Sequence, residues 1–206
     1  IMTMKRIFLM LTALIAISAS AENVSWLRYP SISPDGKSVA FSYKGDVYVV
    51  DSEGGEARQI TSNPAYDYSP VWSPDGKTLY FVSYSADVLP VRFKESISYD
   101  LKKVSFDPET GELGSEVETL YDSHAQGGSV SYPRVSPDGR YLLYTWADYG
   151  TFPIWHAEAD LQMIDLATGQ PVDVSRLNDS ENADSYHSWS SNGRWVMYGS
   201  RRLDGR

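Results

Sequence analysis

Ser33-Pro34-Asp35-Gly36-Lys37 decides the fold of this chain, because the same turn sequence recurs. The other copies are Ser73-Pro74-Asp75-Gly76-Lys77, Ser136-Pro137-Asp138-Gly139-Arg140 and the degenerate Ser190-Ser191-Asn192-Gly193-Arg194. Proline suits the second position of a type I turn, Asp or Asn suits the third, and Gly takes the left-handed position that follows. Each copy therefore predicts a tight β-hairpin with a bulge, and its glycine is expected at positive φ.

A longer unit surrounds each copy of the turn. A short strand follows each copy, at residues 39–41, 79–81, 142–144 and 196–198. After the first three copies comes a third strand that begins with Asp46, Asp100 or Asp160, and then an outer strand at 57–61, 117–120 and 172–174. Four antiparallel strands per unit, repeated at intervals of ~40 residues or more, are typical of β-propeller blades.

The predicted fold class is thus all-β, a β-propeller of four-stranded antiparallel blades. Complete blades are expected at about residues 26–63, 66–121 and 129–177, and an incomplete blade at 184–206. About three and a half blades do not close a ring, since propellers have ~4–8 blades. We therefore expect the chain to be the front part of a longer protein.

The spacing of the units places the extra chain length on one face. Successive turns begin 40, 63 and 54 residues apart, and most of the additional residues lie in 84–97 and 147–158, between second and third strands. The links between blades, at 122–131 and 178–185, lengthen on the same face. Long loops on one face of a rigid scaffold are usual binding surfaces, so a protein or peptide partner is expected there.

Composition restricts the possible partners. The chain of 206 residues has a net charge of −9, whereas binding to nucleic acid or to an anionic membrane needs a basic surface. No nucleic-acid partner is therefore expected. The chain contains no Cys, so disulfides do not hold the fold.

Residues 1–21 have the pattern of an export signal. Lys5 and Arg6 precede an apolar run at 7–17, and Ala19-Ser20-Ala21 fits a cleavage site before Glu22. A membrane anchor is the alternative, but the run is shorter than the ~20 residues that a membrane span needs. We expect a cleaved signal, no stable membrane insertion afterwards, and a periplasmic or secreted mature protein.

The turn sequences, together with the strand Asp46-Val47-Tyr48-Val49-Val50-Asp51, resemble the WD-repeat-like propeller repeats of TolB. TolB is the periplasmic component of the Tol-Pal envelope system. Residues 131–206 also resemble exported TolB-like proteins of Bacteroidota, and residues 26–46 are similar to the start of secreted tricorn-like peptidases. The resemblance implies either an envelope scaffold or the substrate-gating propeller of a tricorn-like or prolyl-oligopeptidase-like peptidase.

The sequence contains no motif for catalysis. A nucleophile elbow, a zinc-binding His-Glu-x-x-His helix and a phosphate loop are all missing from it. His156, Glu158 and Asp160, with Asp184 and His187, could be drawn as a metal site. A structural role is favoured, because Asp160 repeats Asp46 and Asp100. We expect no catalytic residue, cofactor or metal in this chain.

One insertion is unusually aromatic for a loop, which makes it the candidate partner-binding loop. It includes Tyr149, Phe152, Trp155 and His156. These side chains either plug the end of the propeller channel or act as anchors for a partner, since aromatic residues dominate interface energetics. His187 replaces the proline found at the same place in the first three units, and it is expected near this loop.

Two further expectations concern packing. Trp72 and Trp189 directly precede turns, and tryptophans in that place are expected to pack between blades. Valine at a turn glycine should destabilise the fold, whereas valine at Gly127, in a loop, should be less harmful.

Overall fold

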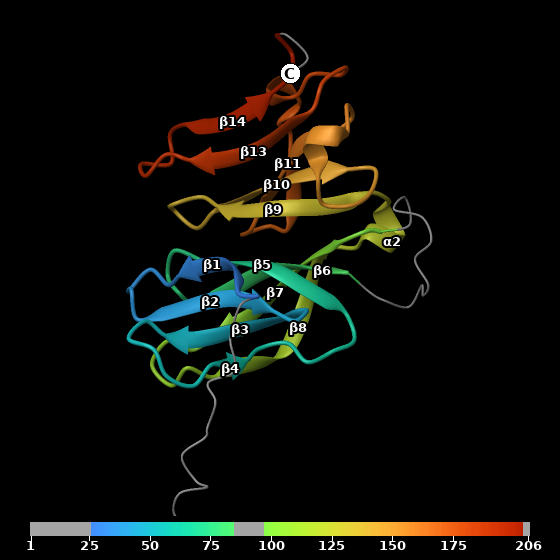
Figure 1. Ribbon diagram of the computed structural model, residues 1–206. Helices are drawn as coiled ribbons and strands as arrows, with labels where there is room; N and C mark the ends of the chain where they lie inside the picture. The colour runs from blue at the N-terminus through green and yellow to red at the C-terminus, as the bar shows by residue number, and fades with distance from the viewer. Residues whose placement is uncertain (1–25, 85–96, 204–206) are drawn as a thin grey trace, which may run out of the picture.

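The computed structural model describes residues 26–84 and 97–203. The predicted export signal and most of the 84–97 insertion lie outside the described residues. Figure 1 shows the first two sheets, coloured blue to green, in the lower half of the view and the last sheet, coloured red, at the top.

Three four-stranded antiparallel sheets and one two-stranded sheet make up the described chain, with the strands of each sheet in sequence order. The first sheet contains β1 (Arg28–Ile32), β2 (Ser38–Tyr43), β3 (Asp46–Asp51) and β4 (Arg58–Gln59). The second contains β5 (Tyr66–Trp72), β6 (Thr78–Tyr84), β7 (Asp100–Phe106) and β8 (Leu113–Tyr121). The third contains β9 (Ser129–Val135), β10 (Tyr141–Ala147), β11 (Asp160–Asp165) and β12 (Gln170–Val172), and the last contains β13 (Asp184–Trp189) and β14 (Val196–Ser200).

The predicted propeller fold is confirmed by these sheets, which do not close into a ring. The third strands begin at the predicted aspartates. The predicted position of the outer strand of the third blade, 172–174, is wrong by two residues. The strand β12 ends at Val172, and the chain then enters a 3-10 helix, η4 (Ser175–Leu177). The other short helices are α2 (Ser123–Gln126) and η3 (Pro153–Trp155).

Each turn is held by one repeated set of hydrogen bonds. In the first copy, the Ser33 hydroxyl donates to Asp35 Oδ1 (2.6 Å) and accepts from the Ser38 N–H (2.9 Å). The Lys37 N–H also donates to Asp35 Oδ1 (3.1 Å). These donors, the Ser33 hydroxyl first, hold the pKa of Asp35 below its ordinary value. The fourth copy keeps the geometry with Asn192 in place of Asp, and the glycines Gly36, Gly76, Gly139 and Gly193 all have positive φ as predicted.

Valine at Gly36 is expected to lower the free energy of unfolding by about 1–2 kcal/mol, because a β-branched residue is strained at a φ of 74°. A Cβ atom at this position meets no other atom within 4 Å, so the expected loss comes from backbone strain and not from a clash of that atom. Urea denaturation measures the change. Asparagine at Gly36, which tolerates left-handed φ, is the control and should be clearly less harmful. Gly127 is no unstrained control, since its φ of 80° is also positive. Equal losses for valine and asparagine would contradict the turn geometry.

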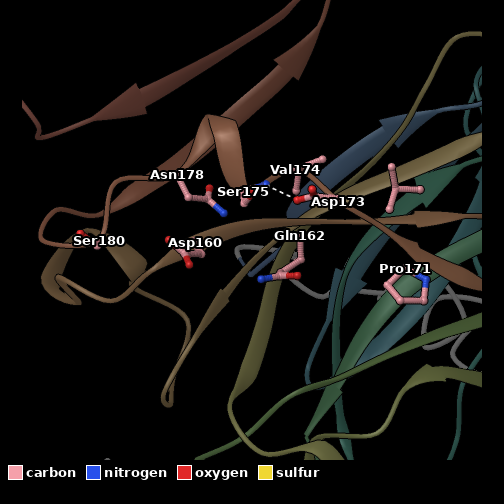
Figure 2. Close-up of a pocket in the computed structure, with 9 residues that line it drawn as sticks. Asp160, Gln162, Pro171, Asp173, Val174, Ser175, Asn178 and Ser180 are labelled. Carbon is pink, nitrogen blue, oxygen red and sulfur yellow. Dashed lines mark hydrogen bonds between the residues drawn. The ribbon is translucent and has the colours of Figure 1, made fainter.

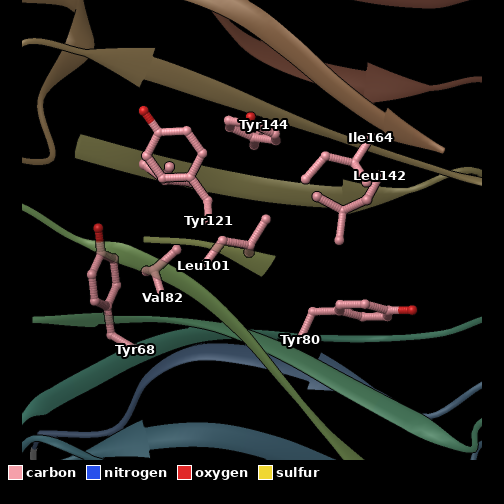
Figure 3. Close-up of a cluster of buried hydrophobic side chains, with 9 residues drawn as sticks. Tyr68, Tyr80, Val82, Leu101, Tyr121, Leu142, Tyr144 and Ile164 are labelled. Atoms are coloured by element: carbon pink, nitrogen blue, oxygen red, sulfur yellow. The ribbon is translucent and has the colours of Figure 1, made fainter. Parts of the chain in front are cut away.

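The first strand of each blade (β1, β5, β9 and β13) is its inner strand, and from the second blade on it packs on the blade before it. The Trp72 side chain donates from Nε1 to the carbonyl of Ser31 (3.0 Å), and Trp189 Nε1 donates to the carbonyl of Arg134 (3.2 Å). Both tryptophans therefore bridge neighbouring blades, as predicted. Apolar side chains fill the space between the sheets. Figure 3 shows the cluster between the second and third blades, which includes Tyr68, Tyr80, Val82, Leu101, Tyr121, Leu142, Tyr144 and Ile164.

A main-chain hydrogen bond joins successive blades at one equivalent position. The donor is an N–H group of the inner strand. The acceptor is a carbonyl of the previous blade, in the residue directly before the aspartate that begins the third strand. The three bonds are Asp67 N to Gly45 O (2.7 Å), Val130 N to Tyr99 O (3.0 Å) and Asp184 N to Ala159 O (2.8 Å).

Each inner strand also carries a bulge with a residue in the left-handed conformation. Tyr29, Ser69, Tyr132 and Tyr186 have φ between 52° and 56°, and the strand register shifts at each of them. The first three directly precede proline, and the fourth precedes His187. Non-glycine residues rarely adopt this conformation, so its repetition marks a built feature of the blade.

Candidate binding face

Tyrosine rings gather along the inner strands and at Tyr99, which directly precedes β7. The ring centroids of Tyr29 and Tyr68 are 5.3 Å apart, those of Tyr68 and Tyr99 are 5.0 Å apart, and those of Tyr132 and Tyr186 are 5.0 Å apart. Burial raises the pKa of Tyr68, Tyr99 and Tyr132, so their hydroxyls are neutral at neutral pH. The cluster consists of aromatic rings with neutral hydroxyls and carries no charge.

The connection between β10 and β11 continues this aromatic surface. A cavity of about 360 Å³ lies beneath it, lined by Ile97, Tyr99, Tyr149, Gly150, Thr151, Phe152, Trp155 and His156. Phe152 and Trp155 are 65% and 82% exposed. Exposure of this degree leaves both rings available to another molecule.

Hydrogen bonds fix the connection in place. The Gly150 N–H donates to the carbonyl of Ile97 (2.7 Å), and the Gly150 carbonyl accepts from the Ser129 hydroxyl (2.7 Å). The Tyr132 hydroxyl donates to the carbonyl of Thr151 (3.4 Å), which links the loop to the inner-strand tyrosines. The cavity is therefore largely pre-formed, as small binding sites usually are.

His156 is held inside the connection. Its Nδ1 lies 2.6 Å from Glu158 Oε1, and the Tyr149 ring stands edge-on to it at 4.4 Å. Burial raises the pKa of Glu158, but hydrogen bonds from its own N–H, His156 and the Asp148 N–H bring the pKa below its ordinary value. His156 thus supports the loop, and one edge of it lines the cavity.

His187 does not join the exposed aromatic residues. It is buried against the third blade, with Nε2 3.0 Å from the carbonyl of Leu143 and Nδ1 3.5 Å from the hydroxyl of Thr145. Burial lowers its pKa to about 4, so the ring is neutral at neutral pH. The structure places this histidine between blades, where contacts of distant strands decide its environment.

A second concavity, which the sequence did not indicate, lies at the outer edge of the third blade. Its volume is about 590 Å³. Figure 2 shows Asp160 and Gln162 on β11, and Asp173, Ser175 and Asn178 on the chain that follows β12. The Ser175 N–H donates to Asp173 Oδ1 (3.0 Å). We call this concavity the outer groove.

Two other kinds of site are absent from the described residues. Within residues 26–84 and 97–203, no three His, Cys, Asp or Glu side chains are grouped as a metal site. No helix in the same part of the chain has the length and apolar character of a membrane span.

No family model matches the chain. An uncharacterized protein of Agrobacterium fabrum is 34% identical over 119 residues, which is 56% of this chain and 38% of the relative. A TolB homolog of Chlorobium chlorochromatii is 44% identical over 45 residues, 21% of this chain and 10% of the relative. The chain thus spans well under half the length of the curated relatives that it matches.

Solved structures show the same fold. The structure of a putative TolB from Agrobacterium tumefaciens has a TM-score of 0.59 at 23% identity, over 86% of this chain and 60% of that one. A puromycin hydrolase has a TM-score of 0.61 at 18% identity, over 88% of this chain and 28% of the hydrolase. The described chain has the fold of β-propeller blades. The predicted resemblance to TolB-like propeller repeats is confirmed.

Proposed function

We propose that this chain is the propeller part of an exported, TolB-like protein of the cell envelope, and that its loop face binds a protein or peptide. The observation that carries the proposal is the pair of exposed rings, Phe152 and Trp155, beside a cavity on a fixed loop. Exposed aromatic anchors next to a pre-formed cavity are the usual features of an interface hot spot. The chain itself then has a binding role and no catalytic one.

The exposure of these rings favours anchors over a plug. A plug would bury its own aromatic side chains against the channel end, because burial of apolar area is what would stabilise it. Trp155 is instead among the most exposed large side chains of the described residues. Its removal should therefore change the fold little.

Phe152→Ala and Trp155→Ala are expected to change the free energy of unfolding by less than about 0.5 kcal/mol, as exposed positions usually do. In the full-length protein, both variants should lose a partner that wild type captures from an envelope fraction. Val117→Ala, at an exposed site on β8, is the control and should keep that partner. A clear drop in melting temperature would favour the plug. Normal melting together with unchanged capture would reject both roles.

A second candidate function is the propeller region of a peptidase. An uncharacterized peptidase of Bacillus subtilis, YuxL, is 44% identical over 55 residues, 24% of this chain and 8% of the peptidase. A propeller of that kind would select substrates for a catalytic domain elsewhere in the protein. Further turn sequences followed by a stop codon after Arg206 would favour the scaffold, whereas a downstream domain with a serine nucleophile would favour the peptidase.

A further inference from the structure

The aspartate that begins the third strand is hydrogen-bonded in the first two blades. Asp46 accepts from the Gln59 side chain (3.0 Å) and from the Thr61 hydroxyl (3.3 Å). Asp100 accepts from the N–H and the hydroxyl of Ser123 (2.9 and 2.7 Å). In both blades, donors come from the chain at or just beyond the outer strand.

Asp160 occupies the same place in the third blade but does not accept such hydrogen bonds. Within the described ranges, no hydrogen bond donor reaches its carboxylate, which is half-buried. Burial and the nearby charge of Asp184 raise the pKa of Asp160 above its ordinary value. The protein around Asp160 therefore disfavours the ionised carboxylate and supplies nothing to compensate it.

Asn178 explains the difference between the blades. Its side-chain amide accepts from the Leu161 N–H and donates to the Leu161 carbonyl, both at 2.9 Å. In the first blade the equivalent groups of Val47 are satisfied by the Thr61 hydroxyl (3.0 Å) and the Ile60 N–H (2.7 Å). The Asn178 amide thus takes the place of both Thr61 and Ile60. It brings no hydroxyl that could donate to Asp160.

The outer groove gives the Asp160 carboxylate access to solvent. Polar side chains of Gln162 and Ser180 lie along the groove, and a second carboxylate, Asp173, lies farther along it (Figure 2). Pro171, Val172 and Val174 supply an apolar wall, and no basic side chain is among the lining residues. The groove therefore combines negative charge with an apolar strip.

This combination suits one kind of ligand. A calcium ion needs six to eight oxygen ligands within a small sphere, and the described residues offer no compact group of three charged ligands. A lysine or arginine side chain needs only a carboxylate for its charged head and an apolar surface for its alkyl stem. The net charge of −9 also attracts basic segments over longer distances.

We propose that the outer groove binds a basic side chain, an arginine or lysine of a peptide segment, with Asp160 as the main partner of its charged head. This site is separate from the loop that carries Phe152 and Trp155, and it does not depend on the function proposed for that loop.

The proposal is tested by measuring the affinity of acetyl-Ala-Arg-Ala-amide for the full chain with isothermal titration calorimetry. The Asp160→Asn variant is expected to weaken the complex about tenfold or more, since hydrogen bonds to charged groups are the strong ones. Citrulline in place of arginine in the peptide should have a similar effect on wild type. Glu112→Gln removes an equal charge from an exposed site outside the groove and should stay within about twofold.

Melting temperatures separate a binding role from a structural one. Asp160→Asn should melt no lower than wild type, whereas Asp100→Asn should melt lower, because the latter weakens the bonds to Ser123. Four results would overturn the proposal: no binding to wild type, equal binding by Asp160→Asn, equal losses in Asp160→Asn and Glu112→Gln, or melting of Asp160→Asn as low as Asp100→Asn.

Discussion

Replacement of Trp72 by alanine is expected to lower the free energy of unfolding by about 3–5 kcal/mol, the usual loss for a large aromatic side chain in a core. The ring is buried between the first two blades and stands edge-on to Phe106 at 4.8 Å. Its removal leaves a cavity and takes away the donor to the carbonyl of Ser31. We expect this to be among the most damaging single substitutions in the chain.

Two variants make this measurement interpretable, with chemical denaturation as the readout. Trp72→Phe keeps much of the ring but not the N–H, and should lose about 1–3 kcal/mol, so it reports the effect even if the alanine variant does not fold. Trp155→Ala removes an equally large ring from an exposed site and should be nearly neutral. Equal losses at the two tryptophans would contradict the packing of Trp72 between blades.

Arg202→Met is expected to destabilise the fold by about 3 kcal/mol, because it leaves a buried carboxylate without its cation. The Asp184 side chain is 0% exposed, and Arg202 Nη2 donates to both of its oxygens (2.9 and 3.0 Å). The arginine side chain is itself 31% exposed, so the loss should fall at the lower end of the range for buried pairs.

A double-mutant cycle checks the origin of that loss. Adding Asp184→Asn to Arg202→Met removes the unpaired charge and should recover part of the stability. Arg194→Met, at an exposed position in the fourth turn, controls for the loss of a guanidinium and should leave the free energy of unfolding nearly unchanged. Strictly additive effects at Arg202 and Asp184 would show that the pair does not act as a unit.

The parts of the fold that the sequence predicted are those with local causes. The turns depend on residues such as Pro34, Asp35 and Gly36, whose preferences act within five positions. The third strands follow because each begins with an aspartate and has apolar residues one and four positions later. The left-handed residue Tyr29 also has a signal in the sequence, because Tyr-Pro or Ser-Pro recurs at one distance before the first three turns. That dipeptide does not by itself reveal a positive φ.

Features that depend on contacts between residues distant in the sequence, or on the detailed course of a loop, could not be predicted. The burial of His187 follows from the carbonyl of Leu143, 44 positions earlier in the chain. The lack of a hydrogen-bond donor to Asp160 follows from the contact of the Asn178 side chain with the backbone of Leu161, 17 positions earlier in the chain. Within the candidate loop, aromatic composition indicated the segment as a whole, but only the structure separates exposed Trp155 from enclosed His156.

The joint between blades has an evolutionary consequence. The bond from the inner strand to the residue before each third-strand aspartate uses only backbone atoms, and its inner-strand donor is Asp67, Val130 or Asp184. A junction made this way tolerates divergence of the side chains on either side of it. A gene duplication that copies one blade also copies a working joint, so blade number can change without redesign of the contacts that remain.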